Sequence, residues 1–321
     1  METVYWTFPN DRKITNLSVL ASPPESLANL SESRWTRSHV VAYAPEKCVT
    51  AQCLNKKGEL LAYAKVYSDG ERCNRQIFDA LWKSISSEKS NLRIPRSLAY
   101  SEEHRTLLIE PLDGRRLAEL NDHERVNGFR RFGAALAALH SIPIPDDLPP
   151  FTRLDSDRLQ EAARIIEHAR PYVAELAGNL ARELCERRNN LTEPTVCLHG
   201  DVHPKNGILK DSRVALVDLD QAGTGPAAAD LGSLLAALRY SRCVGFISYA
   251  DERELIAAFL CGYSEARELP KQDSLRWHTA AALLAERSLR AVHRIRGGGL
   301  KRMGDLLLDS WRLLTEGGYE F

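Results

Sequence analysis

Residues 199–206 read HGDVHPKN and residues 217–220 read VDLD, and these two short segments hold a dense group of acidic, amide and imidazole side chains. Each follows a short apolar run, TVCL at 195–198 and VAL at 214–216, which favours a β-strand that ends in a loop. A loop anchored by a strand holds its side chains rigidly, an arrangement typical of a functional site. We therefore expect the chemistry of this chain to lie between residues 199 and 220.

The side chains of this region are of the types that phosphoryl transfer requires. Such a reaction needs a carboxylate to orient the attacking hydroxyl, oxygen ligands for Mg²⁺, and a cation on the phosphates of the nucleotide. Asp201, Asn206 and Asp218 supply the carboxylate and the oxygen ligands, and Lys65, far upstream, supplies a cation.

HGDVHPKN, VDLD and the later GPAAADLGS at 225–233 together resemble the aminoglycoside phosphotransferase family of small-molecule kinases, relatives of choline kinase and the protein kinases. The resemblance implies a two-lobed, protein-kinase-like α+β fold. It also implies that Asp201 is the catalytic base and that Asn206 and Asp218 hold Mg²⁺. Lys65, in AYAKVY at 62–67, is then the residue that pairs with the phosphates of ATP or GTP.

The resemblance extends to residues 94–117, which are similar to the family's hinge between lobes and place adenine against the backbone from Glu110 to Leu112. The helix acid that pairs with the lysine is assigned to Glu71. His203 stands where protein kinases commonly carry a lysine that touches the transferred phosphate, and we assign it either that contact, when protonated, or a structural role.

Three further side chains of the motif are expected to support the site. His199 is predicted to anchor the loop by hydrogen bonds to the backbone. Asp220 is interpreted as a group behind the metal ligands, with direct assistance to Mg²⁺ as the alternative. Asp230 is predicted to cap its helix and to brace the catalytic loop.

Strand-like patterns dominate the first third of the chain, and the boundary between lobes is predicted after residue 113, giving lobes 1–113 and 114–321. One helix is expected near 71–85, and the strands are expected to pair in chain order. The predicted strands lie at 40–44, 48–54, 60–67, 94–100 and 105–112, with a hairpin turn at NKKG 55–58.

After Gly114 the apolar residues recur at helical spacing. A helix is predicted around 126–139, and a helical region at 156–188 is expected to break near Pro171 and Gly178. The strand–loop–strand segment around HGDVHPKN interrupts this pattern, and helices resume at Ala227. The C-terminal lobe is therefore expected to be mainly helical.

Composition excludes several classes of protein. The 321 residues contain 43 Lys plus Arg and 43 Asp plus Glu, a balance that argues against a nucleic-acid-binding protein. No apolar run reaches the length of a membrane span, and the N-terminus lacks the pattern of a signal peptide, so a cytoplasmic location is expected. The seven scattered cysteines form no metal-binding or redox spacing.

The leading interpretation is a kinase that moves the γ-phosphoryl group of ATP or GTP to a small hydroxyl compound such as an aminoglycoside, amino sugar, sugar or choline-like metabolite. A catalytically weak pseudokinase is one alternative, because no glycine-rich loop lies between the strands at 40–44 and 48–54. A metal-dependent hydrolase built on His199, Asp201 and His203 is the other.

The sequence leaves the acceptor and the oligomeric state open. Arg287, Arg290, Arg294 and Arg296 recur at helical spacing, which is typical of a solvated face but also suits an anionic acceptor. Asp251, Glu252 and Glu254 suit a cationic acceptor instead. These two sets of charges point in opposite directions.

Overall fold

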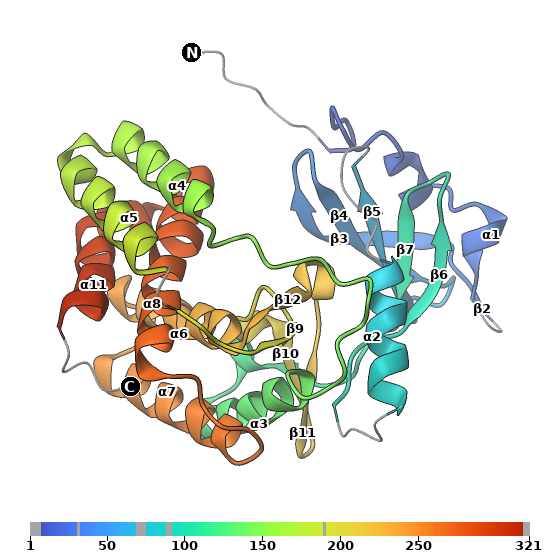
Figure 1. The fold of residues 1–321 in the computed structure, drawn as a ribbon. Coiled ribbons are helices and arrows are strands. Elements are labelled where there is room, and N and C mark those ends of the chain that lie inside the picture. Colours follow the sequence, from blue (N-terminus) through green and yellow to red (C-terminus); the bar gives the residue numbers. More distant parts are fainter. Residues whose placement is uncertain (1–7, 31–32, 69–74, 88–91, 189–190, 317–321) are drawn as a thin grey trace. The chain divides into compact units, whose positions relative to one another are not determined.

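The structure, a computed structural model, describes residues 8–30, 33–68, 75–87, 92–188 and 191–316 (Figure 1). The described residues form two compact units. The N-terminal unit contains the residues up to Lys83 together with Ile94–Asp113. The C-terminal unit contains those of Ser84–Arg93 together with Gly114–Phe321.

A five-stranded antiparallel sheet forms the centre of the N-terminal unit. Its strands are β3 (Arg37–Ala44), β4 (Cys48–Leu54), β5 (Leu60–Tyr67), β6 (Ser97–Ser101) and β7 (Thr106–Ile109). The predicted strands are therefore confirmed, as is the turn at 55–58, where Gly58 adopts a φ of 86°. Helix α2 (Arg75–Ser87) follows β5 along the chain.

The expected pairing of the strands in chain order is wrong, because the sheet order is β3-β4-β5-β7-β6. The connection after β5 passes through α2, so the next strand is not bound to pair with β5 as it would be in a hairpin. All four residues of β7 are buried, whereas β6 is partly exposed along its length. The more apolar strand therefore takes the interior position, and β6 takes the edge.

One face of this sheet is covered by the N-terminal segment of the chain, which includes α1 (Glu25–Ala28), β1 (Asn29–Leu30) and β2 (Ser33–Arg34). Because side chains alternate along a strand, Ala62, Ala64 and Val66 of β5 point into this core and Lys65 points to the opposite face. The core on the covered face is formed by Ile14, Leu17, Val19, Leu20, Leu27, Trp35, Val49, Ala51, Cys53, Ala62, Ala64, Val66 and Leu108.

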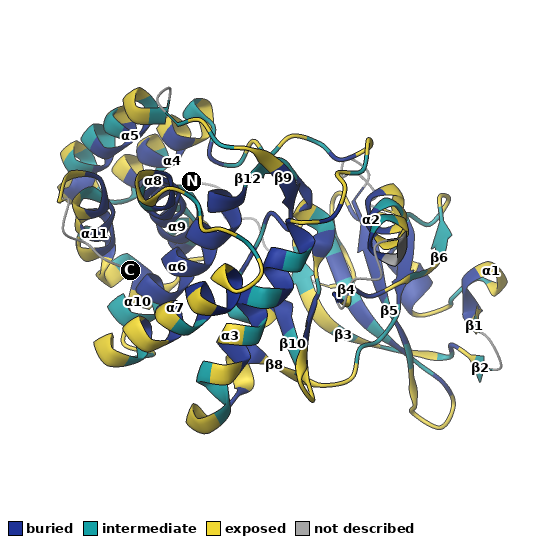
Figure 2. Cartoon of the chain, turned by 60° about the horizontal axis from the view of Figure 1, so that its bottom comes forward, coloured by how far each residue is buried: buried dark blue, intermediate teal, exposed yellow. Residues whose placement is uncertain are grey.

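The C-terminal unit is mainly helical, as predicted. Its principal helices pack in pairs: α3 with α7, α6 with α8, and α4 with α5. Helix α6 is buried on all sides from Ala227 to Tyr240, and Figure 2 shows it in the colour of buried residues along most of its length. The helices are α3 (Asp122–Leu139), α4 (Ser156–Ala169), α5 (Ala174–Arg188), α6 (Ala227–Cys243), α7 (Tyr249–Ser264), α8 (Gln272–Ala282), α9 (Leu289–His293), α10 (Gly297–Lys301) and α11 (Met303–Thr315).

Pro171 breaks the helical region at 156–188 as predicted, because α4 ends at Ala169 and a 3₁₀ turn (Pro171–Val173) precedes α5. The predicted break at Gly178 is wrong, since Gly178 lies inside α5. The packing of α5 against α4 outweighs the low helix propensity of one glycine.

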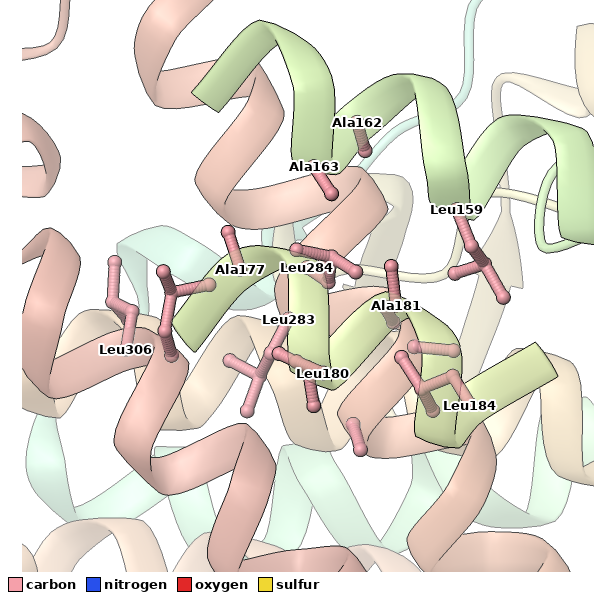
Figure 3. Close-up of a cluster of buried hydrophobic side chains, with 14 of the residues drawn as sticks. Leu159, Ala162, Ala163, Ala177, Leu180, Ala181, Leu184, Leu283, Leu284 and Leu306 are labelled. Atoms are coloured by element: carbon pink, nitrogen blue, oxygen red, sulfur yellow. The ribbon is translucent and has the colours of Figure 1, made fainter. Parts of the chain in front are cut away.

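A π-helical turn (Leu283–Ser288) joins α8 to α9. Leu283 and Leu284 point into a core that α4 and α5 line with Leu159, Leu180 and Leu184 (Figure 3). This buried cluster fixes the position of the turn, which also carries the polar residues Glu286 and Arg287.

Two short strand pairs position the loops of the C-terminal unit. β9 (Thr195–Leu198) pairs with β12 (Gly223–Pro226), and β10 (Gly207–Lys210) pairs with β11 (Arg213–Leu216) and with β8 (Arg115–Arg116). The sequence predicted β9 and β11 but not β10 (GILK) and β12 (GTGP). No helix among the described residues combines the length and apolar character that crossing a membrane requires.

Helices α3 and α7 approach each other closely at two glycines. A Cβ added to Gly262 would lie 1.8 Å from the carbonyl oxygen of Arg130, and one added to Gly133 would lie 2.0 Å from that of Phe259. Both obstacles are backbone atoms, so only movement of a whole helix could relieve the clash.

We therefore expect Gly262→Ala to destabilise the protein by about 2–3 kcal/mol, which lowers the melting temperature by roughly 5–10 °C. Gly178→Ala is the matched control, because this helical glycine has open space around it. It should raise stability by about 0.5–1 kcal/mol. Thermal unfolding of both variants checks the prediction, and equal melting temperatures for the two would contradict it.

Candidate functional site

The loop after β9 starts with a turn that only glycine fits. Gly200 has a φ of 78°, in the left-handed region, and an added Cβ would lie 1.9 Å from the carbonyl oxygen of Gln221. The glycine lets the chain turn sharply between His199 and Asp201, against the segment that follows Asp218.

Asp230, in the first turn of α6, holds this turn in place. Its carboxylate accepts hydrogen bonds from the backbone N–H of His199 at 2.7 Å and of Gly200 at 2.8 Å. His140 donates through Nε2 to the same carboxylate at 3.1 Å, and its Nδ1 accepts from the hydroxyl of Tyr263 at 2.9 Å. Bracing of the loop by Asp230 is confirmed.

The other part of that prediction, that Asp230 caps its helix, is wrong. The residue at the N-cap of α6 is Pro226, which makes no side-chain cap. Asp230 lies four residues further on, so its carboxylate serves the loop rather than the first N–H groups of α6.

The ring of His199 joins the two motif segments. Its Nε2 donates to the carbonyl of Val217 at 2.9 Å, and its Nδ1 accepts from the backbone N–H of Asp201 at 3.4 Å. The predicted anchoring role is therefore confirmed. Both ring nitrogens are engaged within the loop, and no three His, Cys, Asp or Glu side chains in the described part of the chain gather as metal ligands.

Asp201 lies between two arginines that are distant in sequence. One oxygen, Oδ1, lies 3.4 Å from Nη1 of Arg153 and 3.3 Å from Nη2 of Arg290. Burial by itself raises the pKa of Asp201, but Arg153 and Arg290 outweigh it, so the pKa lies well below the ordinary value. Asp201 is therefore ionised at neutral pH, as orientation of a hydroxyl requires.

His203 is close to Asp201, with Nε2 3.7 Å from Oδ2. Burial lowers the pKa of His203 to about 4, against the opposing effect of the Asp201 carboxylate. In this structure the ring is neutral near pH 7, and its Nδ1 accepts from the backbone N–H of Lys205 at 3.2 Å. Contact with a nucleotide phosphate remains a prediction for this residue.

Asn206 and Asp218 are brought together by the backbone. Asn206 donates through Nδ2 to the carbonyl of Asp201 at 3.0 Å, which leaves its Oδ1 as the atom able to bind a cation. The N–H of Val217 donates to the carbonyl of Asn206 at 3.0 Å, so the residue before Asp218 is tied to Asn206. One amide and one carboxylate oxygen suit Mg²⁺, which binds hard oxygen ligands.

The backbone of Asp218 adopts φ 65° and ψ 56°. This is the left-handed conformation, which residues other than glycine rarely adopt. It costs about 1–2 kcal/mol, and Asp and Asn tolerate it better than most residues. Strained backbone of this kind concentrates at functional sites, which is consistent with the predicted role of Asp218.

The remaining predicted residues belong to the N-terminal unit. Lys65 is nearly buried, at 8% exposure, in the middle of β5 and opposite Leu107 of β7. Glu110 follows β7, donates its backbone N–H to the carbonyl of Arg96 at 2.9 Å, and is joined by Pro111 to Leu112. Glu71 lies outside the described residues.

Sequence reasoning missed Arg153 and Glu286. Arg153 lies in the loop before α4 and donates to the carbonyl of Gly200, and its Nη2 lies 3.2 Å from Oε1 of Glu286. Arg153 stands alone in a segment without a motif, so no sequence pattern marked it. Arg290 belonged to the basic stretch for which a solvated face and a site for an anionic acceptor were both open.

Comparison with known proteins gives one family and a set of structural relatives. A family model described as the phosphotransferase enzyme family matches residues 75–278. No curated protein matches the sequence significantly.

Among solved structures, amicoumacin kinase hAmiN, in complex with AMP-PNP, Ca²⁺ and Ami, matches with a TM-score of 0.61 at 13% identity, over 87% of this chain and 88% of that chain. A choline/ethanolamine kinase family protein from Mesorhizobium loti matches with a TM-score of 0.59 at 13% identity, over 94% of each chain. Spectinomycin phosphotransferase APH(9)-Ia, in complex with ADP and spectinomycin, has a TM-score of 0.59 at 11% identity, over 88% of this chain and 94% of that one.

These similarities confirm the predicted fold class, an antiparallel sheet in the N-terminal part and a mainly helical C-terminal part, as found in small-molecule kinases.

Proposed function

The chain belongs to the phosphotransferase enzyme family, and from this premise we propose that it transfers the γ-phosphoryl group of ATP or GTP to a hydroxyl group of a small molecule. The observation that carries the proposal is the hydrogen-bonded frame around Asp201. His199, Asp230 and Asn206 fix the loop of Asp201 and tie it to the segment that carries Asp218. The carboxylate of Asp201 and the segments that carry Asn206 and Asp218 are thereby connected by hydrogen bonds.

In the proposed reaction the acceptor hydroxyl oxygen attacks the γ-phosphorus. The bond from that phosphorus to the bridging oxygen of the nucleotide breaks, and the diphosphate leaves with the electron pair. The proton of the hydroxyl passes to the carboxylate of Asp201 and then to solvent. Because Asp201 has a lowered pKa, its first task is to orient the hydroxyl, and it accepts the proton late in the reaction.

Asn206 and Asp218 are proposed to hold Mg²⁺ through their side-chain oxygens. When bound, Mg²⁺ offsets the negative charge of the nucleotide phosphates. Lys65 is proposed to contact those phosphates from β5, with Glu71 as its partner. His203 is proposed to lie near the transferred group.

Adenine is proposed to bind the backbone between Glu110 and Leu112. The choice of nucleotide is supported by the relatives, since hAmiN was solved with AMP-PNP and APH(9)-Ia with ADP. We propose ATP as the first nucleotide to test and the cytoplasm as the site of the reaction.

Neither alternative function gains support from the geometry. The ring of His199 is engaged in the loop, so it does not offer a nitrogen to a hydrolytic metal together with Asp201 and His203. A catalytically weak pseudokinase would not need Asp201, Asn206 and Asp218 to be held close together. In this chain, hydrogen bonds connect the segments that carry all three residues.

Asp218→Asn should weaken Mg²⁺-dependent binding of ATP by roughly 10- to 100-fold, because it removes one charged metal ligand. Asparagine tolerates the left-handed backbone, so the variant removes charge without changing the turn. Calorimetry with ATP, with and without Mg²⁺, measures the effect.

Asp211→Asn is the matched control, since Asp211 is an exposed acid with a φ of 52° in the turn between β10 and β11. It should bind ATP as the unmodified protein does. Transfer of the γ-phosphoryl group from labelled ATP to a panel of hydroxyl compounds completes the test. A protein that binds no nucleotide in the presence of Mg²⁺ would refute the proposed function.

A further inference from the structure

The arginines around Asp201 form a converging group within the C-terminal unit. Arg153 comes from the loop before α4, Arg287 from the π-helical turn and Arg290 from α9. Arg153 and Arg290 meet at Oδ1 of Asp201, while Nη2 of Arg287 donates to the carbonyl and the hydroxyl of Ser233 at 3.0 and 3.1 Å. The group, which we call the arginine cluster, therefore consists of Arg153, Arg287 and Arg290.

Carboxylates do not balance the arginine cluster. Among the residues that the structure describes, Asp201 and Glu286 are the acids that form ion pairs with it, against three guanidinium groups. Asp230 also acts on Arg153 through its charge, but that carboxylate already accepts bonds from two loop N–H groups and His140. Burial lowers the pKa of Arg287 to about 10, and Arg290 and Arg153 contribute to this shift although Glu286 opposes it. The guanidinium groups therefore repel one another, and Arg287 is the buried member of the three.

Arg290 has unused hydrogen-bonding capacity. Its side chain is 21% exposed, and in the described part of the chain the guanidinium group has one hydrogen-bond partner, Oδ1 of Asp201, 3.3 Å from Nη2. A guanidinium carries five N–H donors in a planar fork that matches a carboxylate or a phosphate. Most of the N–H donors of Arg290 are therefore available to a ligand beside the carboxylate of Asp201.

The π-helical turn is a second unusual feature at the same place. Such turns are rare and are frequent at functional sites. This turn carries Glu286 and Arg287, and Arg290 follows two residues after its end. The buried side chains of Leu283 and Leu284, labelled in Figure 3, anchor the turn in the hydrophobic core.

The acidic residues that suited a cationic acceptor are occupied elsewhere. Glu252 is buried and lies between Arg239 and Arg242, 3.6 Å from the first. Asp251 forms the capping box of α7 with Ser248, and Glu254 is exposed on that helix. Glu252 and Asp251 therefore have structural roles, since both carboxylates are occupied by these contacts.

We infer that Arg290, with the positive charge of Arg153 beside it, binds an anionic group, a carboxylate or a phosphate, that the acceptor carries near the hydroxyl oriented by Asp201. This inference rests on the proposed function and names the class of its substrate. An anion bound to Arg290 replaces Asp201 as the partner of the guanidinium group. The carboxylate of Asp201 is then able to accept the hydroxyl proton.

The test compares hydroxyl compounds that share a carbon skeleton length and differ in charge. One set is glucose 6-phosphate, gluconate, glucose and glucosamine, and the other is glycerol 3-phosphate, glycerate, glycerol and serinol. Each compound is added to the protein with Mg²⁺ and AMP-PNP, and the shift in melting temperature is recorded. Binding of Mg²⁺ and AMP-PNP alone is measured first, so failure of the proposed function is detected separately.

We expect an anionic member of at least one set to raise the melting temperature and its neutral and amino counterparts to have little effect. The phosphate and carboxylate members distinguish the two sources of the anion. The inference is overturned if the neutral or amino compounds stabilise the protein as much as the anionic ones, or if nucleotide binds and neither anion in either set has an effect.

Arg290→Met provides the second readout, because it removes the charge and keeps most of the side-chain volume. For the anionic acceptor, kcat/KM should fall by roughly 10- to 100-fold, and the preference over the neutral compound should disappear. Arg290→Lys should recover part of the preference, since it restores the charge without the fork. Arg296→Met, at an exposed arginine in the same stretch, is the matched control. A preference unchanged in Arg290→Met contradicts the inference.

Discussion

Asp201→Asn is expected to reduce phosphoryl transfer by roughly 10³-fold or more, and to leave binding of ATP with Mg²⁺ within about 3-fold of that of the unmodified protein. The amide has nearly the size of the carboxylate, but it does not accept the hydroxyl proton and has no negative charge to offset the positive charges of Arg153 and Arg290. Because Asn206 binds the backbone carbonyl of Asp201 rather than its side chain, the loop keeps this hydrogen bond in the variant. Steady-state kinetics with labelled ATP and calorimetry measure the two quantities.

A loss of stability has to be separated from a loss of chemistry in this experiment. Removal of the carboxylate leaves two guanidinium groups without their shared partner, so thermal unfolding is measured alongside the kinetics. Asp305→Asn is the control, since Asp305 is an exposed acid paired with Arg302 at 3.2 Å on the same unit. Transfer in Asp201→Asn at a rate near that of the control would remove Asp201 from the catalytic role.

The local parts of the site could be predicted from the sequence because neighbouring residues produce them. HGDVHPKN and VDLD each combine a strand end with a polar loop, and the structure confirms both strands and the anchoring role of His199. The bracing of the loop by Asp230 was predictable in the same way, because GPAAADLGS is a motif with its own spacing.

Contacts between distant segments could not be predicted in this way. Arg153 meets Asp201 across 48 residues and Glu286 across more than 130, and no periodicity connects these positions. The order of the strands was wrong for a related reason: local patterns find each strand, whereas burial of the whole sheet decides which of β6 and β7 takes the interior position.

Patterns of charged residues were the least useful for predicting the site, because the sequence does not show whether a charged side chain is solvated, paired or functional. Glu252 and Arg290 both appeared as members of charged helical stretches. In the structure Glu252 is enclosed by two arginines, whereas Arg290 retains most of its donors. Only the three-dimensional environment separates the two.

Asp230→Ala is expected to lose about 3–5 kcal/mol of stability and nearly all phosphoryl transfer, the largest effect on stability that we predict. Asp230 is 1% exposed and accepts from His199, Gly200 and His140. Alanine removes the acceptor of these three buried donors. Thermal unfolding and steady-state kinetics at a temperature where the variant stays folded measure the result.

Asp230→Asn separates the positioning role from general stability. Its amide oxygen can accept from one loop N–H group, but its amide nitrogen faces the other donor, so the turn at Gly200 is held by one bond instead of two. We expect this variant to fold, to bind ATP almost normally, and to lose roughly 10²-fold in kcat, because Asp201 is displaced relative to the acceptor hydroxyl.

Asp273→Ala is the control for both variants of Asp230. Asp273 also lies in the first turn of a helix, α8, but it is exposed, so its loss removes only a favourable interaction with the helix dipole, worth at most about 1 kcal/mol. A purely structural Asp230 would lower stability in Asp230→Asn and leave kcat per folded molecule unchanged. A fall in kcat without a matching change in the KM for ATP is the result that assigns Asp230 to the positioning of Asp201.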